Sequence, residues 1–361
     1  MAHQLSEQYS DLVLAKLRNE LVLKDQVVFN NDFDGDPTAG AVKIPTREDE
    51  VAASDYDRAA GLAPTTGNTA YVTLPIDKDK AVNEIIDGYE AAAVPDGLVA
   101  ERLDSAGYSL GRAMDTDGAA ELLSGGTTVN VALIDQHSVY GALVKQRTQM
   151  SKDNIPAAGR YALCTPDVIA AVVRSPEFTQ ASSLGDEVKQ SGAIGRIAGF
   201  NVIEFNEDTA GLSMICGHPR FATRVNAWQA PVRLQSLEGS GKYIGASAVQ
   251  GRMVYAHKVL RQKGVRCVFA PAPLELAAAQ GATAGTTVLT INDASEATSY
   301  KYLKNPAQRA VYGASYSGAA VTSGTTEIAA AAGDVVEVAG IKGGKVVAAG
   351  YITLAATAIK A

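Results

Sequence analysis

The chain has 361 residues, of which 47% are hydrophobic and 20% are charged. This balance supplies a packed core and excludes a chain that is disordered throughout. The formal net charge of −7 argues against a protein that reads nucleic acid through a basic surface, although it leaves room for one that merely encloses nucleic acid.

The N-terminal sequence lacks the basic and apolar regions of a secretory signal, and no window reaches the roughly 18 apolar residues needed to span a bilayer. Residues 5–29 are expected to form an amphipathic helix or an arm, because their leucines and valines fit a partly apolar face.

The stretch from residue 31 to residue 80 is the most informative part of the chain. It is rich in glycine and proline, and residues 31–60 hold eight acids against three bases. Two short alternating runs, Val42–Thr46 and Tyr71–Ile76, predict a two-stranded ribbon. Between them lie about 25 residues that show neither helical nor strand periodicity. Connections of this kind that are longer than about 12 to 15 residues are usually functional or disordered. We therefore expect an extended loop that leans on another copy of the chain, with a solvated loop as the alternative.

A long helix is predicted from about residue 95 to residue 124. Asp96 is a plausible cap, and Ser124-Gly125-Gly126 ends the pattern. The spacings of four and three residues define one apolar stripe, formed by Val99, Leu103, Ala106, Leu110 and Ala113. The opposite face is charged and includes Asp115.

Helices and strands then follow in a mixed order. A helix is expected over residues 135–151, and another opens at Thr165-Pro166-Asp167, where a cap precedes a proline and an acid. Gln262-Lys263-Gly264 is expected to be a hairpin or a return between two strands. The order favours an α+β fold over a doubly wound nucleotide fold. The expected strands cover residues 160–165, 200–205, 212–216, 253–260 and 265–270.

The composition shifts after residue 272 to a tail rich in alanine, glycine and threonine. Strand patterns recur at 286–291, 335–338, 345–347 and 351–354, and Gly343-Gly344 is a two-residue hairpin signal. We expect residues 273–361 to form a small all-β domain of the sandwich type.

No catalytic, cofactor or metal template fits the chain. Residues 32–36 start like a calcium loop, but the sixth position is Pro37 instead of glycine and the twelfth is Lys43 instead of glutamate. Gly239-Ser240-Gly241-Lys242 lacks the rest of a phosphate loop, and no histidine pair has zinc-ligand spacing. The cysteines are expected to be buried, reduced thiols. We therefore predict that the protein is not an enzyme and has no cofactor. The three cysteines are Cys164, Cys216 and Cys267.

Three phrases of the sequence resemble major capsid proteins of tailed bacteriophages. They span residues 71–80, 154–166 and 191–202, and they occur in the order found in that family. No single phrase is diagnostic, but the combination, which covers about residues 1–270, resembles the Hong Kong 97-type capsid family.

The resemblance implies an architecture and a function. Residues 1–30 would be an N-terminal arm and residues 31–80 the extended loop. Residues 81–272 would form a peripheral domain on the spine helix and an axial domain at about 157–235. The protein would assemble in the cytoplasm of a host bacterium into hexamers and pentamers of an icosahedral virion shell around double-stranded DNA. Portal and possible decoration proteins would be its partners.

The chain departs from the family pattern in three ways. It has no long N-terminal extension, which makes a separate scaffolding protein the expected partner. Lys78 or Lys80 could be proposed for the covalent cross-link of some relatives, but no motif identifies an acceptor. The tail after residue 272 lies outside the common fold and suits an outer-surface domain, with an immunoglobulin-like one as an option.

Charged residues of the loop are the candidate intersubunit contacts, with solvated charges as the alternative. An encapsulin-type compartment shell shares the fold and is the second hypothesis for function. A surface adhesin using the β-rich tail is the third, and the absence of a signal sequence weighs against its secretion. The candidate contact residues are Arg47, Asp55, Asp57, Arg58, Asp77, Lys78 and Asp79.

Overall fold

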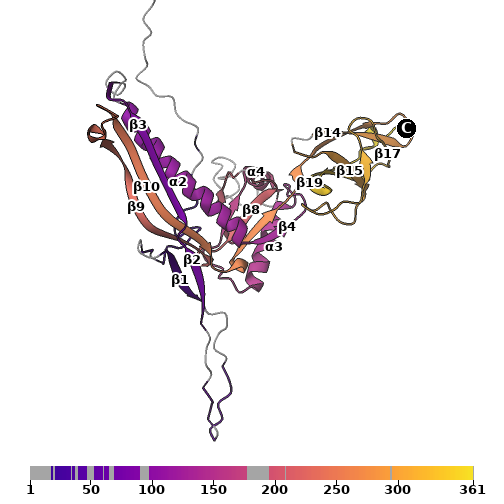
Figure 1. Ribbon diagram of the computed structural model, residues 1–361. Helices are drawn as coiled ribbons and strands as arrows, with labels where there is room; N and C mark the ends of the chain where they lie inside the picture. The colour runs from indigo at the N-terminus through magenta and orange to yellow at the C-terminus, as the bar shows by residue number, and fades with distance from the viewer. Residues whose placement is uncertain are drawn as a thin grey trace, which may run out of the picture. The chain divides into compact units, whose positions relative to one another are not determined.

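A computed structural model (Figure 1) describes residues 18, 21–33, 35–36, 40–46, 53–59, 61–64, 69–89, 97–176, 195–207, 209–292 and 295–360. It has two compact units. Unit 1 combines Met1–Ser124 with Arg220–Leu260, and unit 2 combines Gly125–Pro219 with Arg261–Ala361.

A long helix against a three-stranded antiparallel sheet forms the centre of unit 1. The helix α2 spans Gly97–Gly125 and lies along the sheet (Figure 1). The strand order is β3-β10-β9, with β3 Lys78–Ile86, β10 Ser247–Val259 and β9 Ala222–Ser236. The predicted apolar stripe of α2 packs on this sheet, with Ala106 against Ile86 and Val249. The long helix is thus confirmed, while its expected cap, Asp96, lies outside the described residues.

The predicted two-stranded ribbon is also confirmed. β1 (Ala41–Thr46) pairs antiparallel with β2 (Ala70–Pro75), and Thr46 lies opposite Ala70. The N-terminal segment, in contrast, is not helical over residues 21–30, where it forms a turn and isolated bridges. The arm is therefore the better interpretation of that part.

A six-stranded mixed sheet and two helices form one part of unit 2. Its strand order is β4-β11-β8-β5-β7-β6. The helices α3 (Val139–Lys152) and α4 (Pro166–Arg174) both match predicted helices. Thr165 precedes α4, but its hydroxyl donates to the Ser213 carbonyl instead of capping the helix. The strands are β4 Thr127–Asn130, β5 Tyr161–Cys164, β6 Arg196–Ile197, β7 Phe200–Glu204, β8 Leu212–Gly217 and β11 Val265–Phe269.

One prediction about chain connections needs correction. Gln262–Gly264 is not a hairpin, because β10 and β11 belong to different sheets. The long hairpin is instead β9–β10, whose first strand was not predicted. β9 lies in unit 1, whose second segment begins at Arg220, and the axial domain at about 157–235 stays a prediction.

The C-terminal part of unit 2 consists of two sheets, ordered β12-β19-β18-β15-β16 and β13-β14-β17. They share one core, in which Leu289 and Ile328 of the smaller sheet pack with Val336 and Ala348 of the larger. The strands are β12 Ala272–Pro273, β13 Glu275–Gln280, β14 Thr286–Asn292, β15 Ser299–Lys304, β16 Ala319–Val321, β17 Glu327–Ala329, β18 Val335–Lys342 and β19 Lys345–Thr353.

The predicted Gly343-Gly344 turn connects β18 to β19. Both glycines have positive φ, 57° and 80°, which is the conformation that a tight hairpin turn of this kind requires and that glycine adopts without a Cβ clash. The hairpin signal was therefore correct, and the two expected strands at 345–347 and 351–354 are one continuous strand.

Candidate intersubunit site

The root of the extended loop is anchored on its own chain. Alternate residues of the ribbon face inward, so that Ile44 and Leu74 are buried against Val225 of β9 and Ala256 of β10. The other face of the ribbon is open to solvent and carries the exposed Tyr71. The ribbon therefore has a fixed base with one face available to another molecule.

The tip of the loop is a formed turn that displays apolar side chains. The Gly61 amide donates to the Asp57 carbonyl at 2.8 Å, and the Ala59 amide donates to Oδ1 of Asp57 at 2.7 Å. Within this turn, Tyr56 and Leu62 are 69% and 56% exposed. Exposed apolar groups on a preformed turn are suited to docking, because little conformational entropy remains to be lost on binding.

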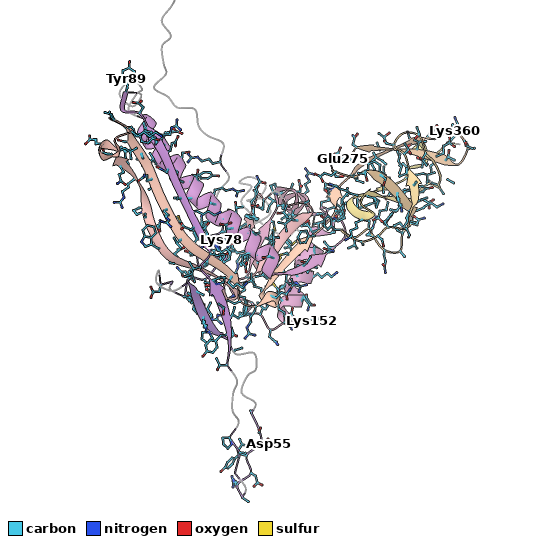
Figure 2. The ribbon with its side chains drawn as sticks, viewed as in Figure 1. Asp55, Lys78, Tyr89, Lys152, Glu275 and Lys360 are labelled. Atoms are coloured by element: carbon cyan, nitrogen blue, oxygen red, sulfur yellow. The ribbon has the colours of Figure 1, made fainter. Side chains whose placement is uncertain are left out.

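The candidate contact residues fall into two groups. Asp55, Asp57 and Arg58 are exposed at the tip (Asp55 is labelled in Figure 2). Asp77 and Lys78 lie at the other end of the loop, with the Lys78 ammonium 3.8 Å from the Asp77 carboxylate. The structure brings these two neighbours together, but it does not gather the whole set into one cluster. Arg47 lies outside the described residues.

Asp79 already has a partner within its own chain. The Arg252 guanidinium donates Nε to Oδ1 of Asp79 at 2.8 Å and Nη2 to the other oxygen. This hydrogen bonding holds the pKa of Asp79 below its usual range. Asp79 lies in β3, as Lys78 does, but its bonds to Arg252 make it the weakest intersubunit candidate. Lys80 is likewise engaged, with its ammonium 3.5 Å from Asp117.

The sequence did not predict a buried polar network that holds the N-terminal segment to α2. Arg224 of β9 is at its centre and is only 6% exposed. Its guanidinium donates to the Leu23 carbonyl at 2.6 Å, to Nε2 of His257 at 3.0 Å and to Oδ1 of Asp25 at 3.1 Å. Arg224 therefore ties the arm to the hairpin β9–β10.

Asp115 completes the network from the helix. We expected it on a charged outer face, but it is buried, and its Oδ2 accepts hydrogen bonds from the Val22 and Leu23 amides at 3.0 and 3.4 Å. The flanking Gly111 and Gly118 leave the space that the arm fills, since a Cβ on either would meet Leu21 or Phe29. The spacing Gly111-Asp115-Gly118 puts all three on one helical face, a signal that was present in the sequence.

The titration of His257 should be visible in the stability of the subunit. Burial and the nearby Arg224 lower the pKa of His257 from 6.5 to about 3. Because the unfolded chain takes up this proton at higher pH than the folded chain, stability is full above pH 6.5 and is lost as pH falls toward 3. The loss should approach about 1.4 kcal/mol per pH unit. Urea titrations of the unassembled subunit at several pH values should show this slope, and His257→Gln should reduce it. Identical slopes in both proteins would contradict the assignment.

The described residues form no cluster of histidine, cysteine, aspartate or glutamate that could hold a metal ion. Within the same part of the chain, no helix has the length and apolarity that crossing a membrane requires. All three cysteines are buried and form no disulfide, and burial raises the pKa of Cys164 and of Cys267 to about 12. They are therefore protonated thiols, as expected from the sequence.

Comparison with known proteins gives a family match. A family model described as phage capsid protein matches residues 88–268. The major capsid protein of Escherichia phage T7 is 36% identical over 92 residues, and so is the minor capsid protein of the same phage. These matches cover 24% of this chain and 26% and 23% of the two phage proteins, so the chain spans about a quarter of the curated relatives it matches.

Solved structures extend the likeness to most of the fold. A structure from Mycobacterium phage Che8 has a TM-score of 0.60 at 20% identity, covering 73% of this chain and 96% of that one. The capsid structure of the cyanophage P-SCSP1u has a TM-score of 0.62 at 14% identity, covering 73% and 92%. At these identities the likeness concerns the fold alone.

Proposed function

This chain belongs to the phage capsid protein family, and we propose that it is a structural, non-enzymatic subunit of the capsid shell of a tailed bacteriophage. One observation supports the proposal in addition to the family match. The extended loop has a ribbon anchored on its own sheet and a tip that displays Tyr56 and Leu62 to solvent. Such a tip gains burial only from another molecule, and in a shell that molecule is the next copy of the chain.

We propose further that the fold is of the Hong Kong 97 type. In this assignment α2 is the spine helix of the peripheral domain, and the six-stranded sheet of unit 2 belongs to the axial domain. The 29-residue length of α2 and its packing on a long antiparallel sheet support the assignment. The C-terminal strands would be an outer-surface domain, and their two sheets around one core are compatible with an immunoglobulin-like sandwich.

The proposed mechanism is association through many weak contacts. Copies would close into hexamers and pentamers of an icosahedral shell, in which small contact energies add up over the assembly. Among the candidate residues, Asp55, Asp57 and Arg58 at the tip are best placed for such contacts, with Arg47, Asp77 and Lys78 as further candidates. Asp79 would act mainly within its own subunit.

The proposed partners and cargo follow from the shell. The assembled virion capsid would enclose double-stranded DNA without reading its sequence, as the net charge of −7 suits. A separate scaffolding protein, a portal and possible decoration proteins would act with it, and assembly would take place in the cytoplasm of the host bacterium. Covalent cross-linking through Lys80 is less favoured, because its ammonium lies close to Asp117.

The proposal can be tested by sedimentation velocity on the chain expressed in bacteria. A subunit of 37.5 kDa that forms shells should appear as a discrete population sedimenting far ahead of the monomer. Nuclease treatment and protein analysis of these particles would then separate a phage shell from a compartment that encloses enzymes. A chain that remains monomeric at all concentrations would contradict the proposal.

A further inference from the structure

The solvent-exposed face of one helix in unit 2 carries charge of a single sign. The helix α3 contains Lys145, Arg147 and Lys152 but no aspartate or glutamate, and all three bases are exposed. Lys152 is labelled at the end of this helix in Figure 2. Soluble proteins usually intersperse acids and bases on their surfaces. The helix dipole accounts for a cation in the last turn, but it does not account for Lys145 and Arg147 in the middle.

A fourth base lies next to this face, on the neighbouring hairpin. Strands β6 and β7 are joined by a tight turn, in which a Cβ on Gly199 would lie 3.7 Å from Nε of Arg147. Arg147 therefore packs against this turn. Arg196, at the start of β6, is exposed. We call the four exposed bases the α3 basic patch, which consists of Lys145, Arg147, Lys152 and Arg196.

The bases of the α3 basic patch have no acid to balance them. None of the four forms an ion pair with an acid in the described part of the chain, whereas other bases of the protein have such a partner, as Lys80 has Asp117. Asp153, which follows the helix, is engaged elsewhere, with its carboxylate 3.8 Å from the Arg266 guanidinium. The positive charge of the patch is therefore left for another molecule to neutralise.

A buried fifth base adds to this charge. Arg160 is only 2% exposed. Among the described residues, its guanidinium donates to uncharged groups, which are the carbonyls of Arg147, Ile155 and Pro156 and the hydroxyl of Ser151. Burial and the nearby charge of Arg147 lower the pKa of Arg160, but an arginine stays protonated at neutral pH. Its charge therefore strengthens the positive potential at the end of α3.

The layout of the α3 basic patch suits the phosphate backbone of a nucleic acid. Lys145 and Lys152 lie two turns apart on one face, about 10 Å along the helix, which spans about three phosphates of one DNA strand. Ser151 is exposed beside Lys152. Its Oγ accepts hydrogen bonds from Arg160 at 3.2 Å, so its own proton can be donated to a phosphate oxygen. Contacts of this kind position a duplex without reading its bases.

We propose that the α3 basic patch binds the phosphate backbone of double-stranded DNA. The inference deepens the proposed function and rests on it in one respect, namely that the shell encloses DNA. The chain as a whole has a net charge of −7 and repels DNA, but the patch gathers unpaired bases in one place. Release of counterions condensed on the DNA drives such binding, and weak contacts add up over the many copies in a shell.

The first test is the triple variant Lys145→Gln, Arg147→Gln, Lys152→Gln. Fluorescence anisotropy of a labelled duplex of mixed sequence, added to the unassembled subunit over a salt series, measures the affinity. Each lost phosphate contact should reduce the slope of log affinity against log salt by about 0.9, and binding at about 50 mM salt should weaken about tenfold or more. A slope and an affinity equal to those of the wild type would overturn the inference.

A matched control removes the same charge from other places. Lys43, Lys345 and Lys360 are exposed bases outside the patch, and their joint replacement by glutamine should leave the affinity and the slope close to those of the wild type. Thermal unfolding should be unchanged in both triple variants, because all the replaced side chains are exposed. Equal losses of binding in the two variants would show that net charge alone matters, and would overturn the inference.

Competition distinguishes DNA from an acidic protein as the partner. Unlabelled duplex should displace the labelled duplex from the unassembled subunit at lower concentrations of charge than polyglutamate does, because phosphates are more densely spaced along a duplex and condense counterions. Displacement by polyglutamate at equal or lower concentrations of charge would assign the patch to an acidic protein and overturn DNA as its partner.

The outcomes separate this inference from the shell function. If the wild type forms no shells but its subunit binds DNA and the first triple variant does not, the shell function fails and the α3 basic patch stands. If the wild type forms shells and the first variant binds DNA as the wild type does, the patch alone is overturned. A wild type that neither assembles nor binds DNA overturns both.

Discussion

Replacement of residues 46–70 by Asn-Gly should leave a folded subunit that no longer forms stable shells. Pro45 and Tyr71 lie opposite each other in the ribbon, so a two-residue turn can close the shortened loop. The buried residues Ile44 and Leu74 are retained, which should keep the thermal unfolding midpoint close to that of the wild type. Electron microscopy and sedimentation should then find subunits or small oligomers in place of shells.

A less drastic variant tests the apolar side chains of the loop tip while keeping the loop at its full length. Tyr56→Ser with Leu62→Ser keeps the turn at Asp57 and Gly61 but removes the exposed apolar groups. It should weaken assembly less than the deletion does. Normal particles from the deletion variant, together with an unchanged yield, would refute the role of the loop as an intersubunit arm.

Arg224→Met should destabilise the unassembled subunit by about 3 to 5 kcal/mol, the range for breaking a buried charge network from one side. The substitution removes the donor to Leu23, Asp25 and His257 and leaves Asp115 buried, with its Oδ1 no longer 4.0 Å from a guanidinium nitrogen. The free energy of unfolding in urea measures the effect.

Arg252→Met is the matched control for this substitution. Arg252 also donates to an aspartate, but both side chains of its ion pair are about half exposed, and exposed pairs contribute little. We expect a small change in stability from it. Equal losses in the two variants would show that burial of the Arg224 network does not carry the stability of the arm.

Local chemistry explains what could be predicted from the sequence. The stripe from Val99 to Ala113 predicted α2 because helical spacing alone determines which side chains share a face. Gly343-Gly344 predicted a hairpin because tight turns need positive φ. The alternating runs on either side of the loop predicted the ribbon for the same kind of reason, since a strand buries every second residue.

Contacts between distant segments explain what was missed. Asp115 looked like a solvent-facing acid because its partners, the backbone at Val22 and Leu23 and the guanidinium of Arg224, are about a hundred residues away on either side. The strand β9 was missed because its second half is mostly exposed and shows no clean alternation. Without that strand, Gln262–Gly264 was left between two predicted strands, and it was taken for a hairpin or a return.

The candidate intersubunit site could likewise be predicted from the sequence only in part. The loop and its exposed charges could be located from composition, because breakers and acids are visible in the sequence. The engagement of Asp79 by Arg252 could not, since it depends on the register between β3 and β10.

Negative-stain electron microscopy of the expressed chain of 361 residues tests the central claim most directly. A capsid shell protein should give closed particles of uniform diameter, built from repeated rings of subunits, under conditions in which the loop deletion gives none. A field of discrete small oligomers or monomers from the wild-type chain, at concentrations where the folded subunit is intact, would contradict the assignment of this protein as a shell subunit.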